Sequence, residues 1–359
     1  MRQPIHTVYG GAHLFKPDIA SRFGAIALET LRMYAPDPAS LGISEAVYER
    51  VVRKLEREPI EDYRIDFEDG YGIRSDSEED EHAISAAKAV RGRLNAPPFL
   101  GIRIKPLTVA SRPRAIRTLK LFLETLGDIP PDFVVTLPKV TESAQVGELV
   151  RLLEPYGPKL ELMIETPQAI IDSSGQFTIP KLLDAAEGRC RGLHFGPYDY
   201  TASCGIVAEH QSISHPACDF ARHVMLVSTA GRDVMLSDGP TNILPIAKSG
   251  NVQHALRLHF ENVQRALKHG FYQGWDLHPA QLPARYAAVY DFFLRSFESA
   301  AARLRNFIEQ SERATLVGGV FDDAATGEGL INFFRRGLNC GAFSEDEITQ
   351  RGINLSLRE

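Results

Sequence analysis

The sequence predicts an α/β protein in which eight parallel strands close into a (β/α)8 TIM barrel that carries a small C-terminal cap. Two observations favour this fold class. Short β-rich runs alternate with longer amphipathic stretches over most of the 359 residues, which is the pattern of repeated βα units. No Gly-x-Gly-x-x-Gly motif opens a helix after any of these runs, so an open dinucleotide-binding sheet loses its main support.

The expected strands are short runs of apolar and β-branched residues that end in charged or turn-forming residues. They span Thr7–Tyr9, Tyr63–Phe67, Phe99–Ile104, Phe133–Leu137, Leu160–Glu165, Gly192–Phe195, Asp233–Leu236 and Gln273–Leu277. The stretches between them have helical periodicity. The helices expected there span Glu45–Arg57, Glu79–Leu94, Pro113–Leu126, Ala144–Leu153, Asp219–Ala230 and Val252–Lys268.

The pattern changes after a long expected helix from about Gln281 to Arg313. Leu316–Gly319 and the Gly-, Asp- and Thr-rich segment Gly318–Gly329 interrupt it before a short helical tail. We therefore expect a barrel catalytic domain at 1–312 and a C-terminal cap segment at 313–359.

Composition and charge exclude several classes of protein. A formal net charge of −6 without a long basic run argues against a nucleic-acid or anionic-membrane partner. The four cysteines are scattered and form no CxxC pair, so they indicate reduced thiols rather than a disulfide framework or a zinc site. The chain has neither an apolar signal core nor an apolar run of 18 residues, so we expect a soluble cytoplasmic protein.

Polar side chains follow the expected strands, where barrel enzymes carry their chemistry. Glu165 and Asp199 end consecutive strands, so their carboxylates would lie side by side as the hard oxygen ligands that Mg²⁺ or Mn²⁺ prefers. The other strand ends carry Asp66-Phe67-Glu68-Asp69-Gly70, Arg103, Pro138-Lys139, Ser237-Asp238-Gly239 and His278-Pro279. Such a ring suits an oxo-acid that chelates the metal while a guanidinium neutralises the developing enolate charge.

Each of these residues also has a structural interpretation. An acid at a strand end can be the N-cap of the next helix, and Glu68 and Asp69 can lie in a solvated loop. Arg103 can form a purely structural buried ion pair. Lys139 can be a Schiff-base lysine, although a salt bridge or an electrostatic role is favoured. His278 can brace its loop or contact the ligand, and the remaining histidines show no metal-binding spacing.

Six motifs, in order from about His6 to Gln281, resemble the citrate lyase β-subunit-like branch of the HpcH/HpaI aldolase superfamily. They are Asp66-Phe67-Glu68-Asp69, Arg103-Ile104, Leu137-Pro138-Lys139-Val140, Ile164-Glu165-Thr166, Gly196-x-x-Asp199 with Gly205, and His278-Pro279-x-Gln281. The resemblance implies a phosphoenolpyruvate/pyruvate-binding barrel, Mg²⁺ on Glu165 and Asp199, and Arg103 as the group that grips the oxo-acid or enolate. It also implies a homo-oligomer, a trimer or hexamer, in which the cap closes a neighbouring subunit's site.

Three departures from the family pattern bear on the substrate. Asp69 stands about where metal-dependent aldolases of the other branch have a histidine, which favours the lyase-like branch. The run Tyr9-Gly10-Gly11 replaces the Arg-rich strand and Pro-Gly turn of members that act on coenzyme A thioesters. Asn332 replaces the catalytic aspartate of their cap, and a neutral amide cannot exchange a proton at pH 7. A free acid is therefore the preferred substrate over a coenzyme A ester.

The expected function is that of a metal-dependent carbon–carbon lyase or aldolase, which acts through an enolate on a small 2-oxo or hydroxy carboxylic acid. The expected catalytic residues are Arg103, Glu68, Asp69, Lys139 and His278, and the expected substrate-binding residues are Arg103, Gly196, Pro197 and Asp238. The base is Glu68 or Asp69 assisting a water on the metal, or else His278. The alternatives are an acyl-CoA lyase or thioesterase of the citryl/malyl-CoA type, and a non-catalytic metabolite-binding barrel. Phosphoryl transfer lacks a glycine-rich phosphate cradle.

Overall fold

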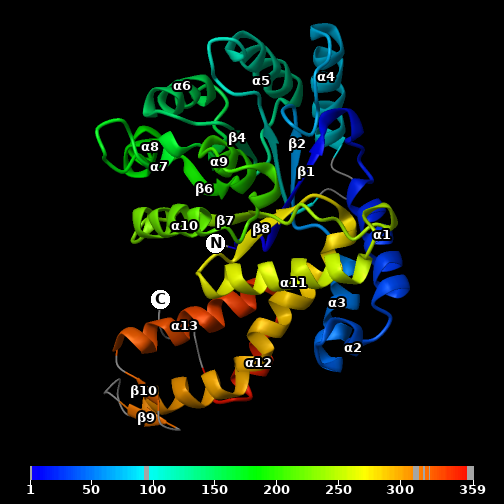
Figure 1. Cartoon of the computed structure of the whole chain (residues 1–359), viewed down its shortest axis with the longest axis vertical. Coiled ribbons are helices and arrows are strands. Elements are labelled where there is room, and N and C mark those ends of the chain that lie inside the picture. The colour runs from blue at the N-terminus through cyan, green and yellow to red at the C-terminus, as the bar shows by residue number, and fades with distance from the viewer. Residues whose placement is uncertain (1, 93–96, 310–314, 318–319, 323, 354–359) are drawn as a thin grey trace.

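The computed structural model describes residues 2–92, 97–309, 315–317, 320–322 and 324–353. Eight parallel strands close into a barrel in chain order, with β1 hydrogen-bonded to both β2 and β8 (Figure 1). The predicted (β/α)8 barrel is therefore confirmed. The strands are β1 (His6–Gly11), β2 (Asp62–Asp66), β3 (Phe99–Arg103), β4 (Val134–Leu137), β5 (Lys159–Ile164), β6 (Cys190–Phe195), β7 (Met235–Pro240) and β8 (Gln273–Asp276).

Helices surround the barrel, and several begin and end where the sequence pattern predicted. The α-helices up to the end of the barrel are α1 (Ile19–Tyr34), α2 (Pro38–Leu41), α3 (Glu45–Arg57), α4 (Asp76–Gly92), α5 (Arg112–Leu126), α6 (Ser143–Leu153), α7 (Pro167–Ile170), α8 (Ile179–Ala185), α9 (Pro197–Ser203), α10 (Pro216–Thr229), α11 (Val252–Lys268) and α12 (Leu282–Glu309). The 3-10 helices are η1 (Ala12–Leu14), η2 (Ala208–His210), η3 (Ala247–Ser249) and η4 (Pro279–Gln281). No helix in the described part of the chain is long and apolar enough to span a membrane.

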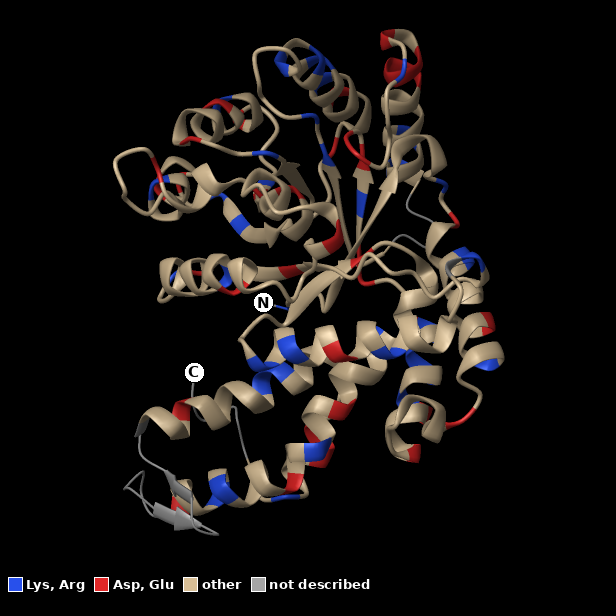
Figure 2. Cartoon of the chain, viewed as in Figure 1, with Lys and Arg blue, Asp and Glu red and all other residues tan. Residues whose placement is uncertain are grey.

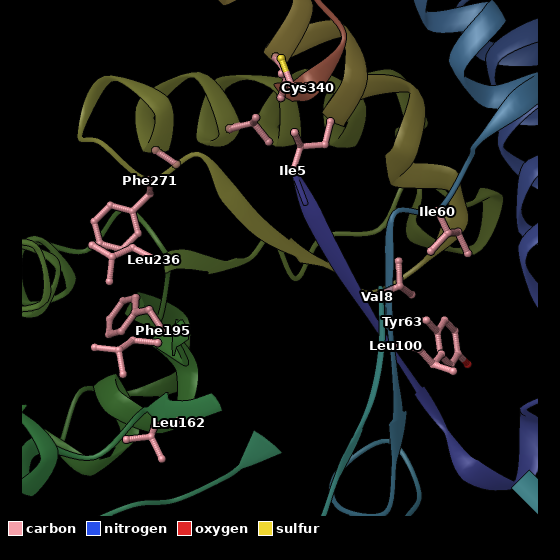
Figure 3. Packing of buried hydrophobic residues seen from close by; sticks show 14 of the residues in the cluster. Ile5, Val8, Ile60, Tyr63, Leu100, Leu162, Phe195, Leu236, Phe271 and Cys340 are labelled. Carbon is pink, nitrogen blue, oxygen red and sulfur yellow. The ribbon is translucent and has the colours of Figure 1, made fainter. Parts of the chain in front are cut away.

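Helix α3 illustrates how local sequence fixes an element. The Ser44 hydroxyl accepts a hydrogen bond from the backbone N–H of Val47 and so caps the amino end of the helix. Val47, Val51 and Leu55 recur every four residues and are buried as one stripe against the barrel. Figure 3 shows the same apolar layer between strands and helices, where Val8, Tyr63 and Leu100 of the barrel pack together.

Helix α1 is not among the helices expected from the sequence, and it carries Gly24 in its middle, a residue type that disfavours a helix interior. The glycine has a packing reason. A Cβ at this position would lie 2.8 Å from Cγ of Pro59, which lies between α3 and β2. Helix α1 therefore approaches the chain before β2 more closely than any larger residue would allow.

The barrel interior is polar, in contrast to the branched apolar side chains that usually fill such barrels. Arg64 of β2 is fully buried and donates hydrogen bonds to Oδ1 of Asp62 at 2.5 Å and to Oε2 of Glu161 at 2.6 Å. Its Nε also lies 3.1 Å from Oγ1 of Thr136. Gly101 leaves room for this arginine, since a Cβ there would lie 3.2 Å from Cδ of Arg64. Charged groups that are paired with one another therefore fill the middle of the barrel.

A second buried ionic group joins the outer face of β8 to the helices. Asp276 is fully buried, and its carboxylate lies 2.9 Å from Nδ1 of His6, 2.9 Å from Nε2 of His259 and 3.0 Å from Nη2 of Arg285. Although its burial acts in the opposite direction, Arg285 and the histidines hold the pKa of Asp276 well below its usual range. This carboxylate thus fixes β1, α11 and α12 around the end of β8.

We expect His259 to make the protein less stable as the pH falls below about 6.5. Burial lowers the pKa of His259, so below its ordinary pKa the unfolded chain takes up a proton that the folded chain does not. Melting temperatures between pH 5 and 8 check this. His259→Gln should flatten the acid side of the profile, whereas His254→Gln, an exposed change on the same helix, should leave it unaltered.

The C-terminal segment lies at the end of the barrel where the strands begin. Helix α12 extends away from the barrel, the strands β9 (Thr315–Val317) and β10 (Val320–Asp322) pair antiparallel, and α13 (Ala324–Cys340) runs back toward it (Figure 1). The guanidinium of Arg336 contacts the side chain of Gln3 and lies 4.4 Å from the ring centroid of Tyr272, the residues just before β1 and β8. Figure 3 shows Cys340 of α13 beside Ile5 at the start of β1.

The predicted short helical tail is in fact a 17-residue helix, followed by α14 (Glu345–Thr349). The predicted boundary between residues 312 and 313 and the predicted end of the long helix at Arg313 lie outside the described residues. Asn332 of α13 lines a cavity of 620 Å³ together with Gln3 and Met235. It therefore lies at the opposite end of its own barrel from the strand-end residues.

Candidate active site

Arg103, the last residue of β3, is held by the carboxylate of Asp66 at the end of neighbouring β2. Its Nε lies 2.7 Å from Oδ1 and its Nη2 lies 2.5 Å from Oδ2, which is a bidentate pair. Its Nη1 lies 3.1 Å from Oε2 of Glu68. Burial acts against the charged form, yet Asp66 and Glu68 hold the pKa of Arg103 well above its ordinary value. This guanidinium is a fixed positive charge, 3% exposed, at the mouth of the barrel.

Lys139, two residues after β4, places its ammonium among three carboxylates. Its Nζ contacts Glu68 and lies 3.3 Å from Oδ2 of Asp69 and 3.6 Å from Oδ2 of Asp199. The backbone of Lys139 has φ +50°, a left-handed conformation that is uncommon for a residue with a side chain. In that conformation its N–H donates a 2.6 Å hydrogen bond to Oε1 of Glu165. The strand-four turn thus binds the strand-five carboxylate through its backbone.

Glu165 directly follows β5 and is 1% exposed. Burial raises the pKa of Glu165 to about 8, against the opposing effects of Lys139 and Arg103, and the negative charges of Asp199 and Glu68 act in the same direction as burial. A protein that kept this carboxyl only for packing would have little reason to surround it with further acids.

Glycines shape the wall opposite Glu165. A Cβ at Gly196 would lie 2.6 Å from Oε2 of Glu165, so only glycine allows β6 to approach the carboxylate this closely. A Cβ at Gly239 would lie 2.2 Å from Cδ of Pro197, the buried first residue of α9. Asp199 lies in the first turn of α9, and its side chain is 44% exposed. The turn after β6 therefore presents Asp199 at the mouth next to Glu165.

Asp238 and His278, which the sequence predicted for the site, make their hydrogen bonds to residues outside the Glu165–Lys139–Arg103 cluster. Asp238 lies inside β7 and not after it, because the strand spans Met235–Pro240 where the sequence predicted Asp233–Leu236. Its carboxylate accepts a 2.8 Å hydrogen bond from Nε of Arg222 on α10, so it faces the helix layer. His278 caps η4, and its Nδ1 accepts the N–H of Ala280 at 3.1 Å. Burial lowers the pKa of His278.

Three residues that the sequence patterns did not single out line the mouth beside Arg103. The ring of Tyr9 lies 4.9 Å from the Arg103 guanidinium, and the ring of Trp275 lies 5.8 Å from it. The two aromatic rings meet edge to face at 4.5 Å. The thioether of Met163 lies 3.4 Å from Nη1 of Arg103. The alternation of side chains along a strand could have predicted these residues. Each lies an even number of residues from another inward-facing residue of its own strand, so its side chain also points into the barrel.

The cluster is chemically suited to a hard divalent cation. Glu68, Asp69, Glu165 and Asp199 surround the single ammonium of Lys139, while Arg103 is already matched by Asp66, so the cluster carries excess negative charge. Figure 2 shows acidic residues beyond the arrowheads of the strands around β2. Within the described residues, no three Asp, Glu, His or Cys side chains converge as a complete ligand set. A cation here would have two carboxylates of the protein and oxygen atoms from water and substrate.

Comparison with solved structures shows which known proteins share this fold. At 17% identity and a TM-score of 0.64, 97% of the chain superimposes on 96% of a citrate lyase from Burkholderia xenovorans LB400. The CitE protein of Mycobacterium tuberculosis in complex with magnesium, acetoacetate and coenzyme A gives 17% identity, a TM-score of 0.59 and coverage of 93% and 98%. Malate synthase from Haloferax volcanii gives 12% identity, a TM-score of 0.51 and coverage of 98% and 97%.

The chain thus shares its fold with these citrate lyase, CitE and malate synthase barrels, which agrees with the citrate lyase β-subunit-like resemblance of the six motifs. The chain itself belongs to the family described as domain of unknown function DUF6986, whose model matches residues 1–358. No curated protein matches it. The structural neighbours named above are a citrate lyase, CitE and a malate synthase, and at 12–17% identity they show the fold that the chain shares with them.

Proposed function

We propose that the chain is a Mg²⁺- or Mn²⁺-dependent carbon–carbon lyase of the aldolase type that acts on a small 2-oxo or hydroxy carboxylic acid through an enolate. One observation carries the proposal: Glu165, Asp199, Lys139 and Arg103 meet at the carboxyl end of the barrel, with excess negative charge beside one fixed guanidinium. We further propose that the protein works as a homo-oligomer, a trimer or hexamer, in the cytoplasm.

Glu165 and Asp199 would hold the cation, which supplies a Lewis acid for the carboxylate and keto oxygens of the substrate. Arg103 stabilises negative charge on the enolate oxygen because Asp66 fixes its guanidinium in place before the substrate arrives. Substrate binding replaces Glu68 on Nη1 of Arg103, which frees the Glu68 carboxylate as a base. Lys139 balances the carboxylates and supplies a second positive group at the mouth.

Glu68 and Asp69 are the favoured bases for the substrate hydroxyl. Burial is the main reason that the pKa of Glu68 is raised, and a raised pKa suits a carboxylate that accepts a proton near neutral pH. Asp69 is more exposed, and although burial acts in the opposite direction, Arg103 and Lys139 lower its pKa, which makes it the weaker base of the two. His278 remains an alternative base in this proposal, although its described contacts hold its own turn.

The test is a cleavage assay on 4-hydroxy-2-oxo acids and on citrate-type hydroxy acids, with Mg²⁺, with Mn²⁺ and with a chelator. Release of pyruvate or oxaloacetate that stops with the chelator and returns with the metal supports the proposal. A chain that binds these acids but cleaves none would be the non-catalytic barrel instead.

Arg103→Lys should lower kcat by about 10²-fold in that assay, because a lysine cannot keep both hydrogen bonds to Asp66 and present a fixed donor to the enolate. Arg189→Lys, a change of the same type in the turn before β6, is the matched control and should leave kcat unaltered. An Arg103→Lys enzyme with wild-type kcat would remove the proposed role of the guanidinium.

Coenzyme A thioester cleavage is the second candidate, because the CitE structure that shares this fold contains coenzyme A. Against it stand Asn332 in place of the cap acid and the absence of an Arg-rich first strand. Calorimetry with acetyl-CoA and with pyruvate separates the two candidates. An enzyme for free acids should bind pyruvate with Mg²⁺ and should not bind acetyl-CoA.

A further inference from the structure

A tyrosine, a histidine and a glutamate form a hydrogen-bonded chain beneath the proposed site that the chemistry above does not use. Oη of Tyr9 on β1 lies 3.2 Å from Nδ1 of His194 on β6. Nε2 of the same ring lies 3.2 Å from Oε2 of Glu161 on β5. The chain therefore crosses the barrel interior, from a residue at the mouth to the buried ionic group around Arg64.

The far end of this chain is a permanent anion. Burial alone would favour a neutral Glu161, but Arg64, His194 and Arg191 together hold the pKa of this carboxyl well below its ordinary value. Its Oε2 receives Nη2 of Arg64 at 2.6 Å and the hydroxyl of Thr136 at 3.2 Å. A carboxylate in this position fixes the orientation of the His194 ring and stabilises a proton on either ring nitrogen.

The near end of the chain borders the place where substrate would bind. The Tyr9 ring lies under the Arg103 guanidinium at 4.9 Å, and Trp275 packs edge-on against it at 4.5 Å. His194 is 2% exposed, whereas Tyr9 is only partly buried and reaches the mouth. An acid held by Arg103 would therefore contact the Tyr9 side chain.

We propose that Tyr9 is the residue that delivers the proton to the enolate carbon, and takes it in the reverse direction, with His194 and Glu161 as positioning residues that resupply the phenol. This inference rests on the proposed enolate chemistry. Two different groups then handle the two protons of the reaction. Tyr9 protonates the enolate carbon, whereas Glu68 or Asp69 accepts the proton of the substrate hydroxyl.

The step balances in the cleavage direction. The carbon–carbon bond breaks, its electron pair passes into the enolate, and the O–H proton of Tyr9 moves to the enolate carbon. The phenolate takes a proton from Nδ1 of His194, while Nε2 of the ring faces the Glu161 carboxylate, and solvent returns a proton to the ring. The hydroxyl proton that the base removed leaves to solvent, so protons and charge are conserved.

The residue types fit this role better than a packing role. A side chain needed only to support Arg103 could be phenylalanine, which gives the same cation–π contact without a hydroxyl. Burial raises the pKa of Tyr9 well above its ordinary value, so the phenol stays protonated and is available as an acid.

Tyr9→Phe tests the proposal directly, because it removes the hydroxyl and keeps the ring against Arg103 and Trp275. We expect kcat to fall by about 10²- to 10⁴-fold with KM within about twofold of wild type. The rate at which the enzyme exchanges the methyl hydrogens of pyruvate with D2O in the presence of Mg²⁺ should fall in parallel. Tyr156→Phe, which removes a hydroxyl bonded to exposed Glu124, is the matched control and should keep wild-type kcat. A Tyr9→Phe enzyme within threefold of wild-type kcat would overturn the proposal.

A second measurement does not depend on turnover. Oxalate with Mg²⁺ imitates the charge of a 2-oxo acid enolate, and ¹⁵N spectra of the histidine rings, assigned with His194→Gln, report the state of Nδ1. Binding of oxalate should draw the Tyr9 proton toward the ligand and shift the His194 resonances in wild type, but not in Tyr9→Phe. Oxalate that binds without moving His194 overturns the role of Tyr9 and leaves the proposed function intact. Absence of both oxalate binding and cleavage overturns the proposed function and this inference with it.

Discussion

Glu165→Gln should lower metal-dependent cleavage by about 10³- to 10⁴-fold, because Lewis-acid activation of an oxo-acid contributes several kcal/mol and requires a charged ligand. The amide has the same shape as the carboxyl, and it can still accept the N–H of Lys139. The melting temperature in the absence of metal should therefore stay near the wild-type value. Calorimetric titration with Mg²⁺ and kcat under saturating metal are the two measurements.

A matched control is Glu209→Gln, which removes one negative charge from an exposed position in the loop between α9 and α10. It should bind Mg²⁺ like the wild type. If Glu165→Gln retained full metal-dependent activity with a normal metal affinity, the cation would have to bind elsewhere, and the central part of the proposed function would be lost.

Arg64→Met should destabilise the protein by about 3–5 kcal/mol, measured as the free energy of unfolding in denaturant. Arg64 is buried inside the barrel with Asp62 at 2.5 Å and Glu161 at 2.6 Å. A methionine fills a similar volume but removes the buried cation between Asp62 and Glu161, and Glu161 then keeps only the more distant Arg191 and His194. The loss in free energy of unfolding should exceed that of Arg22→Met, a change at an exposed position of α1, by several kcal/mol.

The cause of this destabilisation can be isolated with a second variant. Arg64→Met combined with Glu161→Gln removes the negative charge of one of the two carboxylates and should recover part of the lost free energy. A single Arg64→Met variant that loses less than about 1 kcal/mol would mean that water reaches these carboxylates inside the barrel.

The strand positions could be predicted because each barrel strand is a short apolar run bounded by turns, and Glu45–Arg57 and Val252–Lys268 match α3 and α11 in full. The error at β7 shows where this reasoning fails. Ser237-Asp238-Gly239-Pro240 has the composition of a turn, yet it continues the strand, because Arg222 neutralises Asp238 and Gly239 allows Pro197 to pack closely. A partner on another element decided the local structure there.

Polar residues that follow parallel barrel strands were predicted to meet at one end of the barrel, and the structure brings six of them together there. They are Arg103, Glu68, Asp69, Lys139, Glu165 and Asp199. Their roles in catalysis stay predictions. The sequence did not predict the polar interior, because Arg64 and Glu161 are 97 residues apart and each alone resembles an isolated charge in a strand. The same applies to Tyr9 and His194, which are 185 residues apart. A single sequence contains no signal that pairs such positions.

Closure of the barrel also sets when this protein can fold during its synthesis. His6 pairs with Gly274 across the β1–β8 seam, and Nδ1 of His6 contacts Asp276 two residues later. At about 5–20 residues per second, the ribosome needs about 13 to 54 s to add the 268 residues from Thr7 to Gly274. During that time β1 has no partner on one edge, and His6, Thr7 and Gln3 lack their partners on β8. Unpaired strand edges and exposed apolar surface favour aggregation. We therefore expect nascent chains that do not yet contain β8 to depend on chaperones more than the finished protein does.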